Sequence, residues 1–359
     1  MKILHILNDI REIGNGIINV AIDLACLQAE LGHAVGVISA GGEFEMLLQS
    51  KNIKHFKLDQ SRKPINLIRA AVSYRKIISD FQPDIVHAHM MTGIVLARCF
   101  RNKASYALIS TVHNEFQRSA IIMSLADDVI AVSKAVSQLL QQRGISKKKL
   151  HVVTNGTLGS PRTRPLSEYQ PLPLERPAIV TVAGMYKRKG IAELIDAFCK
   201  VASSFPTVHL YLVGNGPDKV SFEANAYNSQ FPDRIHFEGF QREPQKYLLS
   251  TDIFVLASHK DPSPLVIPEA REAGCAIVAT NVDGIPEALE QGKAGILVPP
   301  FDSNALAEVL TKLLQDPKSL SYWSEQSQIN IKWLNSQRVC EQNLDVYEKS
   351  IQKRKSYAK

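Results

Sequence analysis

The stretch AIVTVAGMYKRKGIAELIDAFCKVA, residues 178–202, contains one complete unit of the fold. Its first six residues are apolar or β-branched at consecutive positions, as in a strand buried on both faces of a parallel sheet. A turn rich in glycine and lysine follows. The last segment has apolar residues at helical spacing: Ile191, Leu194, Ile195, Phe198 and Val201. The stretch therefore predicts a strand, a turn and an amphipathic helix.

The same alternation of apolar runs and helical patterns continues along the whole chain. Strands are expected at residues 2–7, 34–39, 84–89, 106–111, 128–132, 150–154, 178–183, 208–213, 252–257, 275–280 and 295–298. Repeated βα units of this kind predict an α/β protein with doubly wound parallel sheets. The residues after Asn304 are expected to be largely helical, with a frayed basic tail.

A chain of 359 residues exceeds the size at which one core usually stops growing, so two domains are expected. Residues 157–177 contain five prolines and no apolar period, which predicts an irregular linker. We expect an N-terminal domain at 1–165 and a C-terminal domain at 175–334, facing each other across a cleft. A C-terminal helix from about 335 is expected to pack back on the first domain.

The composition is 45% hydrophobic and 21% charged, as in a soluble globular protein. The five cysteines form no C-x-x-C pair, which favours reduced thiols over a disulfide framework or a zinc site. The apolar run at 3–7 is too short for a signal peptide, and no run of about 18 apolar residues exists. These observations predict a cytoplasmic protein.

The net charge of +7 is unevenly distributed. Residues 1–164 hold 21 Lys and Arg against 12 Asp and Glu, whereas residues 165–359 hold 21 against 23. No nucleic-acid-binding motif accompanies the basic half, so an anionic membrane surface or a phosphate-bearing substrate fits better. Segment 62–79 has an apolar stripe (Ile65, Ile68, Val72, Ile78) among basic residues. It fits a lipid-docking helix, or an ordinary helix that covers the first sheet.

Ligands of open parallel sheets bind beyond the carboxyl ends of the strands, and two glycine turns occupy such positions. Gly14 and Gly16 open a helix after the first strand, where free amides can hold a phosphate, although a plain turn explains them equally well. Asn19 replaces the third glycine of a dinucleotide fingerprint. Lys187, Arg188 and Lys189 precede another helix, and their opposition to the helix dipole there predicts a bound anion.

Two acids, Asp261 and Glu269, lie in the stretch HKDPSPLVIPEAREAGC at 259–275. Asp261 follows the strand at 252–257, and Glu269 falls in the first turn of a helix expected from Pro268 to Gly274. Carboxylates at the ligand-binding edge can accept hydrogen bonds from the vicinal hydroxyls of a sugar. A first-turn glutamate can also simply complement the helix dipole.

Two histidines, His87 and His89, alternate on one face at the end of a strand. Metal binding would need a third ligand that the sequence does not identify, so structural or substrate contacts are expected instead. The chain also contains no D-x-D pair, and no metal cofactor is expected.

The whole chain resembles the retaining glycosyltransferases of family 4, which have the GT-B fold of two facing Rossmann-like domains. The C-terminal half carries GNGP, STDIFVLAS, the acid-x7-Glu stretch, EAGCAIVATNVDGIPEAL and GKAGILVPPFD in the family's order. Looser matches in the N-terminal half are DIVHAH, TVHN, AVSKAV and VVTNGT. The resemblance spans roughly 300 residues.

The resemblance assigns roles to residues at both edges of the expected cleft. Glu269 would hold the ribose of a nucleotide-sugar donor, Asp261 the transferred sugar, and Lys189 the diphosphate. His113 would lie beside the donor sugar and the reacting hydroxyl. The remaining donor-binding candidates are Gly14, Gly16, Lys187, Arg188, Phe240, Ser263, Leu265 and Val266, and the acceptor-side candidates are His87, His89 and Asn114.

Two positions depart from the family pattern. Asp261 stands where glutamate is usual, and Met185 stands where arginine is usual. Loss of a cation from the diphosphate would cost about 2–4 kcal/mol of transition-state stabilisation, unless Lys187 or Arg188 replaces it.

The resemblance implies metal-independent, retaining transfer of a sugar to a saccharide or lipid-linked acceptor in surface polysaccharide or glycolipid synthesis. Peripheral contact with the inner membrane face is expected from the basic N-terminal domain. Two alternatives stay open: a nucleotide-sugar epimerase of the same fold, and a non-catalytic sugar-nucleotide-binding subunit. The missing third glycine disfavours a nicotinamide oxidoreductase.

Overall fold

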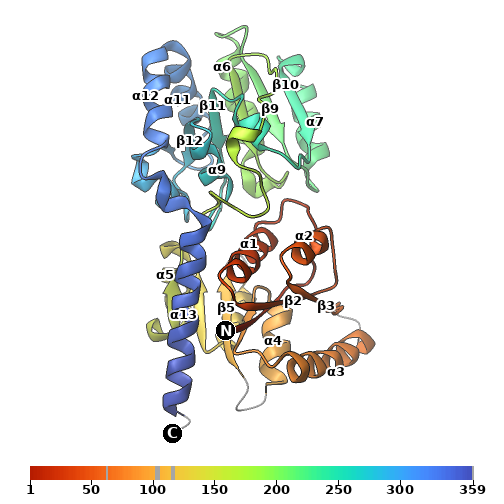
Figure 1. Ribbon diagram of the computed structural model, residues 1–359. Helices are drawn as coiled ribbons and strands as arrows, with labels where there is room; N and C mark the ends of the chain where they lie inside the picture. Colours follow the sequence, from red (N-terminus) through yellow and green to blue (C-terminus); the bar gives the residue numbers. More distant parts are fainter. Residues whose placement is uncertain (62–63, 102–105, 115–117, 358–359) are drawn as a thin grey trace. The chain divides into compact units, whose positions relative to one another are not determined.

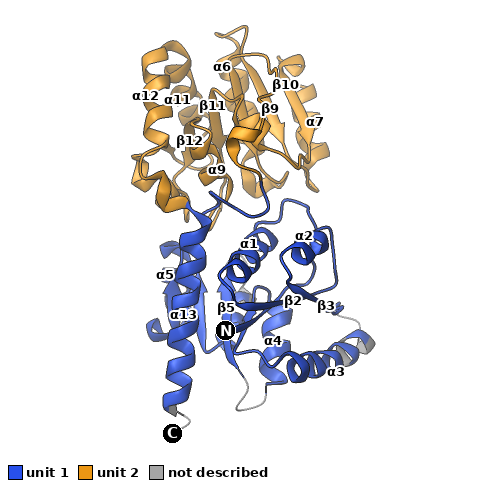
Figure 2. Cartoon of the chain, in the orientation of Figure 1, with its two compact units in different colours: residues 1–163, 335–359 blue, residues 164–334 orange. Residues whose placement is uncertain are grey.

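The structure is a computed structural model that describes every residue except 62–63, 102–105, 115–117 and 358–359. The chain divides into two compact units (Figure 2). Unit 1 comprises residues 1–163 and 335–359, and unit 2 comprises residues 164–334. The first dividing point lies within the proline-rich segment 157–177.

Unit 1 is built on a seven-stranded parallel sheet of order β3-β2-β1-β4-β5-β6-β7 (Figure 1). Its strands are β1 Lys2–Ile6, β2 Ala34–Ser39, β3 Lys54–Lys57, β4 Ile85–Ala88, β5 Ala107–Val112, β6 Asp128–Ala131 and β7 Leu150–Val152. Its helices are α1 Gly16–Glu30, α2 Glu45–Ser50, α3 Pro64–Phe81, α4 Met91–Cys99, α5 Lys134–Gln142 and α13 Ser336–Tyr357.

Unit 2 is built on a six-stranded parallel sheet of order β10-β9-β8-β11-β12-β13. Its strands are β8 Ala178–Val182, β9 His209–Val213, β10 Ile235–Gly239, β11 Ile253–Leu256, β12 Ala276–Thr280 and β13 Ile296–Val298. Its helices are α6 Ile191–Ala202, α7 Lys219–Tyr227, α8 Gln245–Leu248, α9 Val266–Glu272, α10 Ile285–Ala288, α11 Ser303–Gln315 and α12 Pro317–Ser327.

The pattern in residues 178–202 forms the elements that it predicts. β8 is buried along most of its length, and the apolar face of α6 is buried against the sheet through the five residues named above. The prediction of doubly wound parallel sheets is therefore confirmed. The central strands have a hydrogen-bonded neighbour on each side, and their aliphatic side chains are removed from water on both faces of the sheet.

Two strands, β3 and β10, were not expected from the sequence. Both lie at the edge of their sheets. In β3, the sequence KHFK has two exposed and two half-exposed residues, so it has no apolar run to detect. The predicted start of α9 is also wrong, because the helix begins at Val266 and Pro268 is its third residue. Proline is tolerated there because the amides of the first turn lack partners within the helix.

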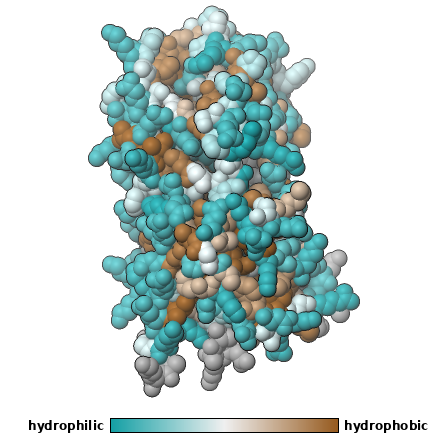
Figure 3. Space-filling model, in the orientation of Figure 1, coloured by the Kyte–Doolittle hydropathy of each residue, from teal (hydrophilic) through white to brown (hydrophobic). Residues whose placement is uncertain are grey.

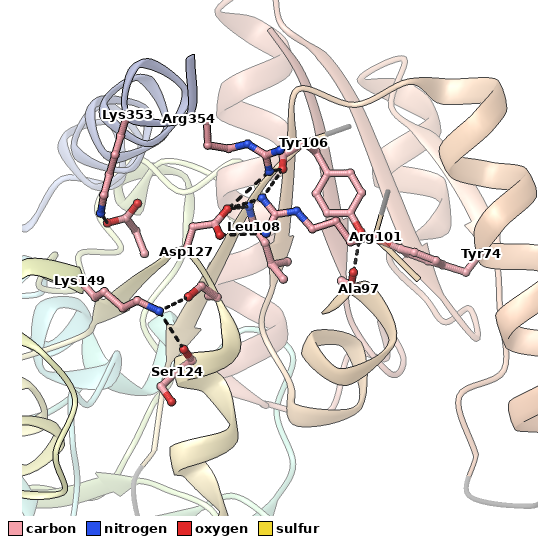
Figure 4. A network of polar contacts seen from close by, with 12 residues as sticks. Tyr74, Ala97, Arg101, Tyr106, Leu108, Ser124, Asp127, Lys149, Lys353 and Arg354 are labelled. Carbon is pink, nitrogen blue, oxygen red and sulfur yellow. Dashed lines mark hydrogen bonds and ion pairs between the residues drawn. The ribbon is translucent and has the colours of Figure 1, made fainter. Parts of the chain in front are cut away.

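The expectation of a frayed basic tail is wrong, because α13 continues to Tyr357. Figure 4 shows the contacts that hold its end: Arg354 donates to the carbonyl of Tyr106, and its guanidinium lies 3.7 Å from the Asp127 carboxylate. The ammonium of Lys353 lies 3.7 Å from the carboxylate of Asp128. Acidic groups near the start of β6 thus receive the cations of α13.

The proline-rich segment is fixed to unit 1 by a buried ion pair. The guanidinium of Arg162 donates from Nε and Nη2 to the two carboxylate oxygens of Asp23 on α1, at 2.8 and 2.9 Å. Ser160 donates to the same carboxylate at 2.6 Å. The segment is irregular but anchored, as polar contacts of this kind can fix a loop without regular structure.

The helix α3 covers the sheet of unit 1 with a face different from the predicted stripe. Its core-facing residues are Ala70, Tyr74, Ile77 and Phe81, whereas Val72 is 66% exposed. Ile78 is partly buried, and the side chains of Ile65 and Ile68 lie outside the described part of the chain.

Across the described residues, no helix combines the length and apolar character needed to cross a bilayer. The face in Figure 3 is mostly hydrophilic, with smaller apolar areas interspersed.

Candidate active site

The turn after β8 brings a cluster of cations to the carboxyl edge of the unit 2 sheet. Lys187, Arg188 and Lys189 form a single 3₁₀ turn that ends at Gly190, directly before α6. Gly190 has φ +65°, and a Cβ there would lie 1.9 Å from the carbonyl oxygen of Ala257. Only glycine permits this approach, which seats the turn against the end of β11. The amide of His259 donates to the carbonyl of Arg188 at 2.8 Å.

Lys189 and Asp261, two predicted site residues 72 positions apart, are in direct contact. The Lys189 ammonium lies 2.5 Å from Oδ2 of Asp261, and the two side chains are only 14% and 8% exposed. Charges removed from water in this way interact more strongly than a surface pair. A partly buried cation is therefore held at the point where the neighbouring strands β8 and β11 end.

Asp261 is positioned by Asp283, which the sequence analysis did not single out. The Asp261 amide donates to Oδ2 of Asp283 at 2.8 Å, and the amide of Gly284 donates back to the Asp261 carbonyl at 3.1 Å. Burial raises the pKa of Asp283, and the hydrogen bond from the Asp261 backbone opposes that shift. Its position after β12, within the motif NVDG, was the available signal.

The remaining predicted residues of the β11–α9 segment lie along one short stretch. Ser263 and Leu265 precede α9, and Val266 begins it; all three are half-buried. Glu269 lies in the first turn of α9 and is also half-buried. A carboxylate in that turn is favoured by the helix dipole.

Met185 is a core residue. Its side chain is fully buried within the apolar cluster of unit 2. Lys187 and Arg188 are exposed, and the Arg188 guanidinium lies 5.3 Å from the centre of the Tyr186 ring. In the family pattern, arginine is usual at the position of Met185. Lys187 and Arg188 are the exposed cations that could take its place.

Phe240 directly follows β10, one of the two edge strands of the unit 2 sheet, and is 40% exposed. The preceding Gly239 has φ +68°, so the chain turns sharply at the end of the strand.

In unit 1, Gly14 has φ +69° and is exposed, and Asn15 caps α1 by accepting from the amide of Ile17 at 3.0 Å. Gly16 is the first residue of that helix.

The carboxyl edge of the unit 1 sheet carries four histidines. His5 on β1 lies beside His87 on β4 in the parallel register, and His89 and His113 directly follow β4 and β5. His5 Nδ1 lies 2.9 Å from His89 Nε2, and His89 Nδ1 lies 3.2 Å from His113 Nε2. Asn114 is next to His113 in the chain and is exposed.

Two residues missed by the sequence analysis complete this cluster from the covering helices. Gln28 of α1 accepts from His5 Nε2 at 2.8 Å. Tyr347 of α13 lies 2.6 Å from His87 Nδ1, and His87 Nε2 lies 2.7 Å from the hydroxyl of Thr111. The two-residue alternation along β1 and β4 could have linked His5 to the pair of histidines, but Tyr347 is 260 residues from His87.

Burial keeps these histidines neutral. It lowers the pKa of His5 to about 4 and of His113 to about 3, and lowers the pKa values of His87 and His89 well below the usual range. His5, His87 and His89 offer nitrogens within 4.8 Å of one another, a spacing compatible with a metal ion. However, each of their six ring nitrogens already has a hydrogen-bond partner.

Comparison with known proteins assigns both halves of the chain. Residues 164–329 match the family model "Glycosyl transferases group 1", and residues 14–157 match "Glycosyltransferase Family 4". Both models describe glycosyltransferases and together they span most of the chain, which is therefore a glycosyltransferase. The expected family and enzyme class are thereby confirmed.

Relatives of this glycosyltransferase include two lipopolysaccharide core biosynthesis glycosyltransferases of Rhizobium meliloti. LpsD is 24% identical over 297 residues, which cover 81% of this chain and 83% of LpsD. LpsE is 26% identical over 171 residues, which cover 47% of this chain and 49% of LpsE. The alignment thus spans about half the length of LpsE. N-acetyl-α-D-glucosaminyl L-malate synthase of Bacillus anthracis is covered to a similar extent, 44%.

Solved structures establish the GT-B fold of this glycosyltransferase. Anabaena HepE in complex with UDP-glucose has a TM-score of 0.83 at 19% identity, over 97% of this chain and 100% of HepE. WaaG, a glycosyltransferase involved in lipopolysaccharide biosynthesis, has a TM-score of 0.76 at 16% identity, over 96% and 99% of the two chains. The predicted fold class is therefore confirmed.

Proposed function

We propose that this glycosyltransferase moves a sugar, with retention of anomeric configuration, from a nucleotide-diphosphate sugar to a saccharide or lipid-linked acceptor. The observation that carries the proposal is the partly buried Lys189–Asp261 pair at the carboxyl edge of the unit 2 sheet, beside exposed Lys187 and Arg188. A cation fixed at a strand end, with a carboxylate on it, suits a ligand that has both a diphosphate and sugar hydroxyls.

The roles follow from the charges. Lys189 stabilises the negative charge that develops on the diphosphate, with Lys187 or Arg188 as a second cation. Asp261 and Glu269 accept hydrogen bonds from hydroxyls of the sugar and the ribose, respectively. Amides around Ser263, Leu265 and Val266, and those at Gly14 and Gly16, are further phosphate donors in this proposal, with Phe240 near the base.

The transfer proceeds on one face of the sugar. The bond from the anomeric carbon to the phosphate oxygen breaks, and the acceptor oxygen bonds to the same face. The acceptor proton passes to the departing diphosphate, and the sugar passes through an oxocarbenium-like state. Cations and amides receive the leaving-group charge, so we expect no requirement for a metal ion.

The donor and acceptor classes are proposed from relatives. The structure of HepE with UDP and UDP-glucose makes a UDP-hexose the first donor to test. The names of LpsD and of the putative colanic acid glycosyltransferase WcaL of Escherichia coli favour a surface polysaccharide or glycolipid acceptor, for which His87, His89 and Asn114 are acceptor-side candidates.

Peripheral membrane contact is proposed for unit 1, which holds 26 Lys and Arg against 15 Asp and Glu. Sedimentation with anionic and neutral vesicles tests it. Binding to the anionic vesicles alone, weakened by salt, is the expected result, and equal or absent binding to both would exclude an electrostatic contact.

The nucleotide site is tested by thermal shift with UDP, GDP, ADP and dTDP, with and without EDTA. Glu269→Gln is compared with Glu272→Gln, which removes another half-buried carboxylate from the same helix. One nucleotide should raise the melting temperature of the wild type and of Glu272→Gln but not of Glu269→Gln, regardless of EDTA. No shift with any nucleotide would contradict the proposal.

Product analysis then separates the alternatives. Proton NMR of the transferred sugar should show the anomeric configuration of the donor. A changed sugar without transfer would indicate an epimerase. Binding without any loss of donor would indicate a non-catalytic subunit.

A further inference from the structure

Three of the four histidines at the carboxyl edge of the unit 1 sheet, His5, His89 and His113, form one hydrogen-bonded chain that ends at an amide oxygen. We propose that the Oε1 atom of Gln28 fixes, through His5 and His89, the tautomer of His113 in which Nε2 carries the proton and Nδ1 is the acceptor. The chain makes Gln28, His5 and His89 positioning residues for His113. The role of His113 in catalysis rests on the proposed function, whereas the assignment of its tautomer does not.

The direction of every bond follows from the amide oxygen, which can only accept. Because Gln28 Oε1 lies 2.8 Å from His5 Nε2, the proton of this bond is on His5 Nε2. A neutral His5 then has a lone pair on Nδ1, so His89 Nε2 donates across 2.9 Å. His89 Nδ1 is left as an acceptor, and His113 Nε2 donates to it across 3.2 Å.

Burial keeps the chain in this state. His5 and His89 are almost completely removed from water, where a charged imidazole is unfavourable, and their lowered pKa values agree with neutral rings. A neutral imidazole has one N–H and one lone pair, so each ring transmits the choice made at Gln28 to the next ring. His113, directly after β5, receives this choice and presents Nδ1 as a hydrogen-bond acceptor.

The other amide atom of Gln28 begins a second branch. Gln28 Nε2 donates to the hydroxyl of Tyr347 at 3.4 Å, and this hydroxyl donates to His87 Nδ1 at 2.6 Å. His87 Nε2 in turn donates to Thr111. Since the branch leaves from the amide nitrogen, it supports the orientation of Gln28 without any bond to His89 or His113.

These contacts suit a hydrogen-bonded chain better than a metal site. Of the three closely spaced histidines, His87 directs its nitrogens to Tyr347 and Thr111, and His5 and His89 direct one nitrogen each at the other. A metal ion would need lone pairs where the chain needs protons. Stoichiometric metal in the purified protein, measured by elemental analysis, would therefore overturn the proposal.

The test is histidine ring NMR of the full chain labelled with ¹⁵N-histidine, with the His113 signals identified by loss in His113→Gln. The expected result is a protonated Nε2 and an unprotonated Nδ1 at neutral pH. A protonated Nδ1, or two protonated nitrogens, would overturn the proposal. The measurement needs no substrate, so it succeeds or fails independently of the proposed function.

Two variants separate the chain from its branch. Gln28→Met removes the accepting oxygen at similar volume, and His113 should then populate both tautomers. Tyr347→Phe removes the branch but leaves the path from Gln28 Oε1 to His113, so the tautomer of His113 should stay as in the wild type. The same tautomer in wild type and Gln28→Met would contradict the proposal.

A third variant guards against misfolding of Gln28→Met. In Gln28→Glu a carboxylate contacts His5 and favours its doubly protonated form, whose Nδ1 then donates to His89. Each later bond reverses, and His113 should carry its proton on Nδ1. An unreversed His113 beside a doubly protonated His5 would contradict the proposal.

Kinetics connect the chain to catalysis. In an assay of sugar transfer, Gln28→Met should lower kcat about 10-fold, with little change in the KM for the donor, because loss of a partner that orients a histidine impairs the reacting state. A kcat equal to that of the wild type would contradict this link, and an equal change in the KM for the donor would indicate a merely structural role.

Discussion

The carboxyl edges of the two sheets carry different side chains: buried histidines in unit 1 and lysine and arginine in unit 2. At its carboxyl edge, unit 1 gathers buried neutral histidines, although it has 26 Lys and Arg against 15 Asp and Glu. Unit 2 has 16 against 20, yet its edge presents three successive cations. The net charge of a unit therefore does not determine the charge of its site. The residues that follow each strand determine it.

The largest predicted effect concerns Lys189, at the carboxyl edge of the unit 2 sheet. Lys189→Met should lower kcat by about 10²–10³-fold, because a preorganised cation for the leaving diphosphate is lost and Asp261 is left without its partner. Transfer from the nucleotide-sugar donor is the measurement. Lys200→Met, a change at an exposed lysine on α6 that pairs with Asp196, is the matched control and should retain activity. Similar losses in both variants would contradict a specific role for Lys189.

A smaller effect concerns the buried histidines at the carboxyl edge of the unit 1 sheet. Because of them, the free energy of unfolding should decrease as the pH is lowered. His5 has a pKa of about 4 in the folded protein against 6.5 for an unperturbed histidine. Between these values the unfolded chain binds the proton more readily, so the free energy of unfolding decreases as the pH falls below 6.5. His5 alone should cost about 2 kcal/mol between pH 7 and 5.

Urea unfolding at the two pH values measures this loss, and His5→Gln should reduce it. His87, His89 and His113 act in the same direction, because burial lowers their pKa values too. A pH dependence unchanged by His5→Gln would show that the acid sensitivity arises elsewhere.

The smallest effect is predicted at Met185, which lies in the apolar core of unit 2. Met185→Leu conserves volume and should cost less than about 1.5 kcal/mol of stability, with activity nearly unchanged. Thermal unfolding and the transfer assay are the measurements. A large loss of activity with unchanged stability would mean that Met185 contacts substrate after all.

Much of the fold could be predicted from the sequence. Central strands and α6 were recognisable because burial on both faces, or on one stripe, leaves an uninterrupted apolar pattern. β3 and β10 were not, since charged and polar residues interrupt the apolar pattern of KHFK and IHFEG. Local stereochemistry, such as the helix start at Val266, depends on contacts that no short window contains.

The candidate site divides along the same line. Lys189 and Asp261 were identifiable because each follows a buried strand at the ligand-binding edge, and the structure brings them into contact. His5, Gln28 and Tyr347 were missed because their partners come from strand register and from helices far away in the chain. The available signal was the polar residue in the middle of the apolar strand KILHIL, because a buried polar side chain needs a hydrogen-bond partner.

The return of α13 to unit 1 has a consequence for synthesis on the ribosome. Unit 1 is made of the first 163 residues and of residues 335–359, so the whole of unit 2 is translated between its two parts. Until Tyr347 emerges, His87 Nδ1 lacks its hydrogen-bond partner, and the sheet lacks part of its cover. Unit 2 can thus complete its core before unit 1, whose core needs residues 335–359, which are translated after all of unit 2.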